Sequence, residues 1–244
     1  MHFVLLPGLD GTGELFEEFV GATPEGCEVT VVSYPPDEEL SYDECVNYAA
    51  GRLPSSGPFF VLGESFSGPV AISLSARHPP GLVGVVLCNT FACAPAWRGF
   101  ARLPWTALFS LRLNRFTAGL HLVGFSNTGQ WIERIREANR KTAPRVLARR
   151  MREVLSVDVR DRLESIRVPI LYLRGTRDRL VGRGSLDRIL DRRPDVQVAP
   201  IDAPHLTLQL EPELSWAAID GFLPAARGAG GRDAPLGATG GLQP

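Results

Sequence analysis

The sequence predicts an α/β fold in which a mainly parallel six-stranded sheet is flanked by helices. Short β-rich runs alternate with helical patterns along the chain, which is the arrangement of βαβ units. Several of these runs are continuously apolar, as in Phe59–Leu62. Strands of a parallel sheet show this pattern because both of their faces are buried. The 244 residues are 44% hydrophobic and 22% charged, which excludes a wholly disordered chain.

The first half of the chain alternates regularly between strands and helices. Ser41 precedes a helical stretch as an N-cap, and Glu44 stands at the capping-box position. Pro79 and Pro80 end another helix, because proline cannot extend one. In chain order, the expected elements are strand Phe3–Leu6, helix Glu14–Val20, strand Glu28–Ser33, helix Tyr42–Leu53, strand Phe59–Leu62, helix Phe66–Arg77 and strand Val83–Leu87.

An insertion then interrupts the alternation. About 80 residues separate the strand that ends near Leu87 from the strand that starts near Val168, far more than a usual connection. We therefore expect residues 91–156 to form a mostly helical cap over one end of the sheet. The insertion begins aromatic and becomes basic and helical over Trp131–Leu155. The elements expected after it are strand Ile170–Arg174, helix Leu186–Asp191, strand Val196–Ile201 and helix Leu206–Phe222.

The main domain is expected to span residues 1–224. Residues 225–244 are rich in Gly, Ala and Pro and carry almost no large apolar side chain, so we expect a disordered tail. The residues after Met1 show neither a basic region nor a cleavage site of a secretory signal. No apolar run is long enough to predict a membrane span.

Charge and cysteine content exclude further classes. A formal net charge of −1 argues against nonspecific electrostatic binding of nucleic acid. The four cysteines form no CxxC pair, so neither a disulfide scaffold nor a zinc site is expected, and reduced thiols indicate a cytoplasmic protein. No cluster of residues has metal-ligand spacing, and we expect no cofactor.

A serine follows the strand Phe59–Leu62 in the sequence Gly-Glu-Ser-Phe-Ser-Gly. This is close to the G-x-S-x-G turn that exposes a nucleophilic serine between a strand and a helix. Gly63 is small, as the strained turn requires, whereas Ser67 stands where glycine is usual. Ser65 is therefore the candidate nucleophile. The alternative is an ordinary strand-to-helix turn built from small residues.

A serine hydroxyl needs a base, and the base needs an acid to orient it. His205 follows the last predicted strand, at the edge where parallel sheets place catalytic groups. His2, His78 and His121 lie in less suitable positions. Asp178 follows the preceding strand, and Asp202 is its competitor, although it lies close to His205 in the chain. An ordinary surface loop remains the alternative for His205.

Glycines follow the first strand in Pro7-Gly8-Leu9-Asp10-Gly11-Thr12-Gly13. Such a loop lets backbone N–H groups approach a developing oxyanion closely. The predicted donors are the amides of Leu9 and of Phe66, the residue after the candidate nucleophile. The rival interpretation is a phosphate-binding loop. Asp10 would repel a phosphate there, and no Gly-Lys-Ser/Thr sequence follows.

Together, the glycine loop, the serine turn and the order Ser65…Asp178…His205 resemble the α/β-hydrolase superfamily. The resemblance covers residues 1–224 and implies a cap after the strand that ends near Leu87. It also implies that the first hairpin of the family is missing and that Glu28–Ser33 lies near a sheet edge. The glycine loop looks most like small bacterial hydrolases, and it is also similar to plastid phytyl ester synthases. Pro7 replaces the histidine that usually organises this loop.

The predicted reaction is cleavage of a carboxylic ester or thioester through an acyl-enzyme intermediate. An acyltransferase with the same triad and a non-catalytic binding protein are the alternatives. The expected substrate is a small, apolar acyl compound, because Phe91, Trp97 and Trp105 could line a tunnel for an acyl chain. The alternative is that these aromatic residues only pack the cap against the core. The basic stretch of residues 134–152 could attract an acidic acyl carrier, but a solvated helix face is the preferred explanation.

Overall fold

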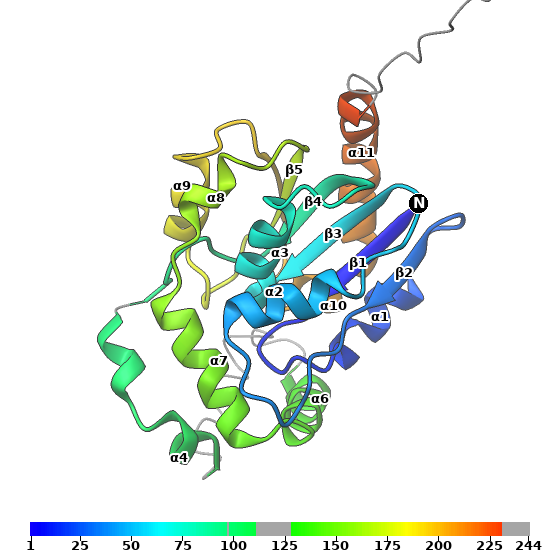
Figure 1. Cartoon of the computed structure of the whole chain (residues 1–244). Helices are drawn as coiled ribbons and strands as arrows, with labels where there is room; N and C mark the ends of the chain where they lie inside the picture. The colour runs from blue at the N-terminus through cyan, green and yellow to red at the C-terminus, as the bar shows by residue number, and fades with distance from the viewer. Residues whose placement is uncertain (97, 111–127, 231–244) are drawn as a thin grey trace, which may run out of the picture.

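The computed structural model describes residues 1–96, 98–110 and 128–230. It contains a six-stranded sheet in the order β2-β1-β3-β4-β5-β6, and every pair of neighbouring strands is parallel (Figure 1). The predicted fold class is confirmed, and β2 lies at an edge as expected. The strands are β1 (His2–Leu6), β2 (Glu28–Val31), β3 (Phe59–Glu64), β4 (Leu82–Cys88), β5 (Ile170–Gly175) and β6 (Gln197–Ile201).

The strand order reverses between β1 and β3. These strands are neighbours, with Leu6 opposite Gly63 at their carboxyl ends. The loop after β1 and the turn after β3 therefore emerge side by side. Open parallel sheets bind ligands at such a switch point, because adjacent loops diverge there. The glycine loop and Ser65 occupy this position.

Alternate residues of the strands face two apolar layers. On one face, Val4, Val61 and Val85 pack against the helices α2, α3, α8 and α9. On the other face, Phe3, Phe60 and Val86 pack against η1, α1, α10 and α11. The helices of the two layers are η1 (Glu14–Phe16), α1 (Glu17–Gly21), α2 (Tyr42–Ala50), α3 (Gly68–Ser75), α8 (Arg160–Leu163), α9 (Arg183–Leu190), α10 (Thr207–Leu210) and α11 (Pro212–Gly230).

The predicted helices are present, but several of their ends differ by two or three residues, and the last predicted helix differs more. The capping box of α2 is present, with the Ser41 backbone N–H donating to Glu44 Oε2 at 2.7 Å. The last predicted helix is instead two, α10 and α11. Helix α11 continues past Pro224 to Gly230, into the segment for which a disordered tail was expected. Alanines at 225, 226 and 229 favour helix there. Residues 231–244 lie outside the described part of the chain.

The described parts of the insertion are helical, namely η3 (Arg98–Arg102), α4 (Trp105–Ser110), α6 (Thr128–Arg140) and α7 (Pro144–Ser156). The stretch Trp131–Leu155, expected to be helical, forms two helices, α6 and α7, and Pro144 occupies the first turn of α7. An antiparallel bridge between Cys93 and Asp158 joins the two ends of the insertion. Helices α6 and α7 lie beyond the carboxyl ends of the strands (Figure 1). Their role as a cap stays a prediction.

Within the described residues, no helix is both long enough and apolar enough to cross a membrane.

Candidate active site

The turn after β3 holds Ser65 in a strained conformation. Its φ is 47°, a left-handed value that a non-glycine residue rarely adopts. Gly63 permits this turn, because a Cβ there would lie 2.7 Å from the Ser67 carbonyl oxygen. Gly68 is also required, because its Cβ would overlap the side chain of Thr90. Ser67, at the usual glycine position, is fully buried, and its hydroxyl is hydrogen-bonded.

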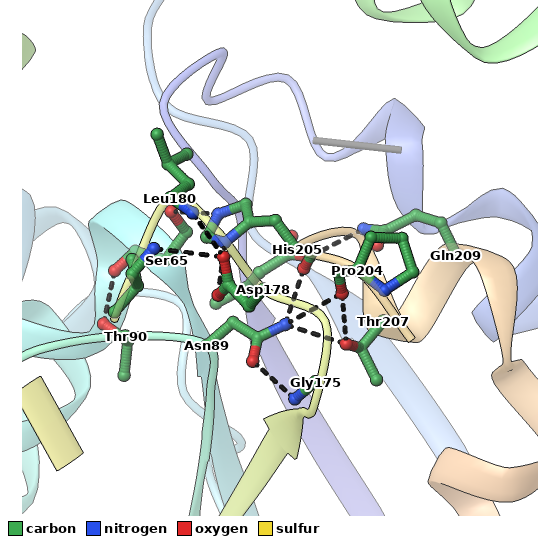
Figure 2. A network of polar contacts seen from close by, with 12 residues as sticks. Ser65, Asn89, Thr90, Gly175, Asp178, Leu180, Pro204, His205, Thr207 and Gln209 are labelled. Atoms are coloured by element: carbon green, nitrogen blue, oxygen red, sulfur yellow. Dashed lines mark hydrogen bonds and ion pairs between the residues drawn. The ribbon is translucent and has the colours of Figure 1, made fainter. Parts of the chain in front are cut away.

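Three side chains predicted from distant parts of the chain meet at this edge (Figure 2). Ser65 Oγ lies 2.9 Å from His205 Nε2, and His205 Nδ1 lies 2.8 Å from Asp178 Oδ2. The His205 and Asp178 side chains are 2% and 3% exposed, so water hardly reaches this contact. An ionised carboxylate only accepts hydrogen bonds, so Nδ1 carries the proton and Nε2 is free to accept the Ser65 proton.

The loop after β5 fixes the Asp178 carboxylate. Its Oδ1 accepts the backbone N–H groups of Leu180 and Val181 at 2.8 and 3.0 Å, which leaves Oδ2 for His205. The competing Asp202 is exposed and lies 2.9 Å from Arg177 Nε. Among the described residues, the His205 ring forms its hydrogen bonds with Asp178 and Ser65 and not with Asp202. Of the other histidines, His2 contacts Thr30 and His78 is exposed, whereas His121 lies outside the described residues.

Asn89 and Thr90, which directly follow β4, brace both sides of this site and were not predicted. Asn89 is 1% exposed and has a φ of 43°. Its Nδ2 donates to the His205 carbonyl at 2.7 Å, while its Oδ1 accepts the Gly175 N–H at 2.8 Å (Figure 2). The Thr90 hydroxyl donates to the Ser65 carbonyl. Their position directly after β4 could have identified them, because parallel sheets place functional groups at the carboxyl ends of strands.

The glycine loop lies against the serine turn. The Ser67 hydroxyl donates to the Pro7 carbonyl, and the Tyr42 hydroxyl donates to the Phe66 carbonyl at 2.9 Å. Within the described residues, neither the Leu9 nor the Phe66 backbone N–H donates to another group. Both predicted oxyanion donors are therefore unpaired, as donors reserved for a ligand must be.

The aromatic residues predicted to contact substrate have different surroundings. Phe91 is 2% exposed and packs in the core layer with α2 and α3. The Trp105 indole N–H donates to the Phe100 carbonyl at 2.9 Å, and its ring contacts Phe109. Trp97 lies outside the described residues. Phe91 thus helps to anchor the start of the insertion to the core.

The basic stretch of α6 and α7 is largely paired with acidic side chains. Arg134 contacts both Glu17 and Glu18, which ties α6 to α1. Lys141 lies within hydrogen-bonding distance of Glu14, at 2.5 Å. Further ion pairs join Arg136 and Arg140 to Glu133, Arg145 to Glu39, and Arg149 to Glu153. This pairing reduces the positive charge available to an acidic carrier.

Glu64, the residue before Ser65, is a buried carboxyl group that sequence analysis did not single out. It is 3% exposed, and Gln209 Nε2 donates to its Oε1 at 2.8 Å. Burial raises the pKa of Glu64 to about 7; the Gln209 hydrogen bond and His205 oppose this rise, and Asp10 adds to it. Between about pH 4.5 and pH 7, Glu64 is therefore protonated in the folded protein and ionised in the unfolded chain.

This proton makes stability depend on pH. Between about pH 4.5 and pH 7 the folded state binds more protons at Glu64 than the unfolded state, so the free energy of unfolding falls as the pH rises. We expect Glu64→Gln to remove this fall and to gain up to about 3 kcal/mol on the wild type by pH 8. Urea unfolding of both proteins at pH 5 and pH 8 measures it. Identical pH dependence would contradict a buried, protonated Glu64.

The comparisons with known proteins agree with this architecture. N-formylmaleamate deformylase from Pseudomonas putida is 23% identical over 203 residues, which are 78% of this chain and 70% of the relative. The hydrolase olei00960 from Oleispira antarctica has a TM-score of 0.77 at 14% identity, covering 91% of this chain and 90% of that one. The enol-lactonase from Burkholderia xenovorans has a TM-score of 0.73 at 19% identity, with 91% of each chain covered.

The sheet order, the strained serine turn and these structural relatives define the α/β-hydrolase fold. The predicted resemblance to this superfamily is confirmed. Within it, the family model described as serine aminopeptidase, S33, matches residues 41–206, which is more than half of the chain. The chain belongs to this family.

Proposed function

We propose that this protein is a serine hydrolase that cleaves a carboxylic ester or thioester through an acyl-enzyme intermediate. One observation carries the proposal, namely the continuous hydrogen-bonded chain from Ser65 through His205 to Asp178. The three residues follow β3, β6 and β5, so three separate strands hold them at one edge of the sheet. A buried carboxylate, an oriented imidazole and a serine in this order form a nucleophile with its base.

The reaction proceeds in two steps. His205 Nε2 takes the hydroxyl proton of Ser65 as Oγ attacks the carbonyl carbon, and the resulting imidazolium gives that proton to the departing alcohol or thiol. Water then loses a proton to His205 and attacks the acyl carbon. Ser65 departs and regains the proton from the imidazolium. The Leu9 and Phe66 amides receive the negative oxygen in both steps. Helices α6 and α7 of the insertion cover the acyl group.

The name of the curated relative supports a second candidate, hydrolysis of an amide. N-formylmaleamate deformylase is similar to this chain over 203 residues, and the same serine attack serves a carbonyl attached to nitrogen. Matched ester and N-formyl amide substrates with the same acyl group distinguish the two reactions. An acyltransferase would instead form an ester product when an alcohol is added.

A fluorophosphonate probe tests the proposed function directly. We expect it to label the wild type on the peptide that carries Ser65, because the probe reacts with serines activated by a base. Ser65→Ala should lose the label together with p-nitrophenyl ester hydrolysis. The exposed Ser165→Ala is the matched control and should retain both. An unlabelled wild type would favour a binding protein, and labelling that survives in Ser65→Ala would contradict the assignment of the nucleophile.

A further inference from the structure

We propose that Arg150 is a positioning residue that holds the glycine loop in the shape of an oxyanion hole. The inference rests on the proposed function and deepens it. Arg150 belongs to the basic stretch of α7, but its surroundings differ from those of its neighbours. Its side chain is among the largest that are fully buried, and the residue is only 2% exposed.

The Arg150 guanidinium reaches the loop carbonyls from the insertion. Nη1 donates to the carbonyl oxygens of Leu9 and Asp10 at 3.0 and 2.6 Å, and Nη2 donates to that of Pro35 at 3.2 Å. The group also lies near the rings of Tyr34 and Phe66, at 5.6 and 6.0 Å from their centroids. It thus bridges the segments that carry both predicted oxyanion donors, Leu9 and Phe66.

Four successive carbonyl groups of the loop are each held. The Pro7 carbonyl accepts the Ser67 hydroxyl, and the Gly8 carbonyl accepts the Gly11 N–H at 3.1 Å. Arg150 holds the next two, and the Thr142 hydroxyl also donates to the Asp10 carbonyl at 2.8 Å. With these carbonyls held, the peptide planes have little freedom to rotate, and the Leu9 N–H keeps its direction.

The two departures from the family pattern belong to this arrangement. Pro7 replaces the usual histidine, and Ser67 replaces a glycine, yet the Ser67 hydroxyl binds the Pro7 carbonyl. The Tyr34 hydroxyl lies 3.1 Å from Ser67 Oγ and continues the network. Ser67 on one side and Arg150 on the other therefore hold the glycine loop in place of the absent histidine. Preorganised donors of this kind stabilise a transition state without reorganisation.

The fit at Gly11 shows how closely Arg150 approaches the loop. Gly11 has a φ of 73°, and a Cβ there would lie 2.1 Å from Arg150 Nη1. Among the described residues, no carboxylate forms a salt bridge with this guanidinium, so three carbonyls and two rings surround a buried charge. Burying such a charge costs free energy, which hydrogen bonds to the loop offset. Burial accordingly lowers the Arg150 pKa, with Asp10, Tyr34 and Cys45 opposing.

The test compares Arg150→Met with Arg149→Met in the full-length protein. Arg149 is the adjacent residue on α7, is 38% exposed and pairs with Glu153. For Arg150→Met we expect kcat on a p-nitrophenyl ester to fall about 10- to 100-fold, with KM changed by less than about threefold, because a misplaced donor weakens only the transition state. Arg149→Met should keep both constants. Arg150→Lys, which retains the charge without the fork, should restore part of kcat.

A second measurement separates positioning from general damage. The thiol introduced by Ser65→Cys should be alkylated by iodoacetamide with help from His205, a reaction that forms no oxyanion. Adding Arg150→Met to this background should leave the alkylation rate unchanged. Equal losses in alkylation and hydrolysis, or wild-type kcat in Arg150→Met, would overturn the role of Arg150. Hydrolysis that persists in Ser65→Ala would instead overturn the proposed function itself.

Discussion

His205→Ala is expected to lower kcat for ester hydrolysis by about 10⁶-fold, an effect as large as that of removing the nucleophile itself. His205 is the one base in hydrogen-bonding contact with Ser65 Oγ within the described residues, at 2.9 Å. Without it, the serine hydroxyl keeps its proton and the leaving group receives none, so both chemical steps fail. Single-turnover and steady-state assays with p-nitrophenyl esters measure the loss.

The control for this substitution is His78→Asn. His78 is exposed and has a φ of 53°, and asparagine tolerates the left-handed conformation better than most residues. We expect this variant to retain wild-type kcat. Circular dichroism and a thermal melt should show that both variants are folded. A folded His205→Ala that keeps more than about a hundredth of the activity would exclude the imidazole as the base.

Asp178→Asn is expected to lower kcat by about 10⁴-fold while the fold is retained. The Leu180 and Val181 amides donate to one carboxylate oxygen, so in the variant they select the amide oxygen for that place. The amide NH₂ then occupies the position of Oδ2, 2.8 Å from His205 Nδ1. Nδ1 must accept this hydrogen bond, which moves the ring proton to Nε2. An Nε2 that carries a proton cannot accept one from Ser65.

Asp202→Asn is the matched control, because Asp202 was the competing candidate in the sequence. Its carboxylate is exposed and contacts Arg177 and Thr176, so its substitution should change kcat little. The rates of fluorophosphonate labelling should follow the same order as kcat across the variants. If Asp202→Asn lost activity and Asp178→Asn did not, the loop after β6 would supply the acid, contrary to the geometry described above.

The sheet and its functional edge could be predicted because they depend on local patterns. Short β-rich runs identified all six strands to within two residues at each end. The run of β3 is continuously apolar over Phe59–Leu62, because that strand is buried on both faces. Ser65, Asp178 and His205 each follow such a run, and parallel strands bring their carboxyl ends to one edge. The contacts of these residues were therefore accessible from strand order and turn chemistry, although their catalytic role stays a proposal.

Choices between similar residues needed the tertiary structure. Asp178 and Asp202 both follow strands, and the Leu180 and Val181 amides that orient one of them come from a loop conformation that no local pattern encodes. The stretch Trp131–Leu155 was predicted to be basic and helical, but the sequence pattern did not show that it forms two helices, which separate before Pro144 where Thr142 binds the glycine loop. Asn89 binds the backbone of Gly175 and His205, and these segments come close to it only in the folded chain.

Arg150 shows this division most clearly. In the sequence it is one of many arginines in a basic segment, and nothing in its neighbours distinguishes it. Its burial follows from the rotation of α7 about its axis and from a loop about 140 residues earlier whose carbonyls need donors. Apolar periodicity is a property of neighbouring residues and survives in the sequence, whereas the partner of a buried charge depends on distant segments that meet only after folding.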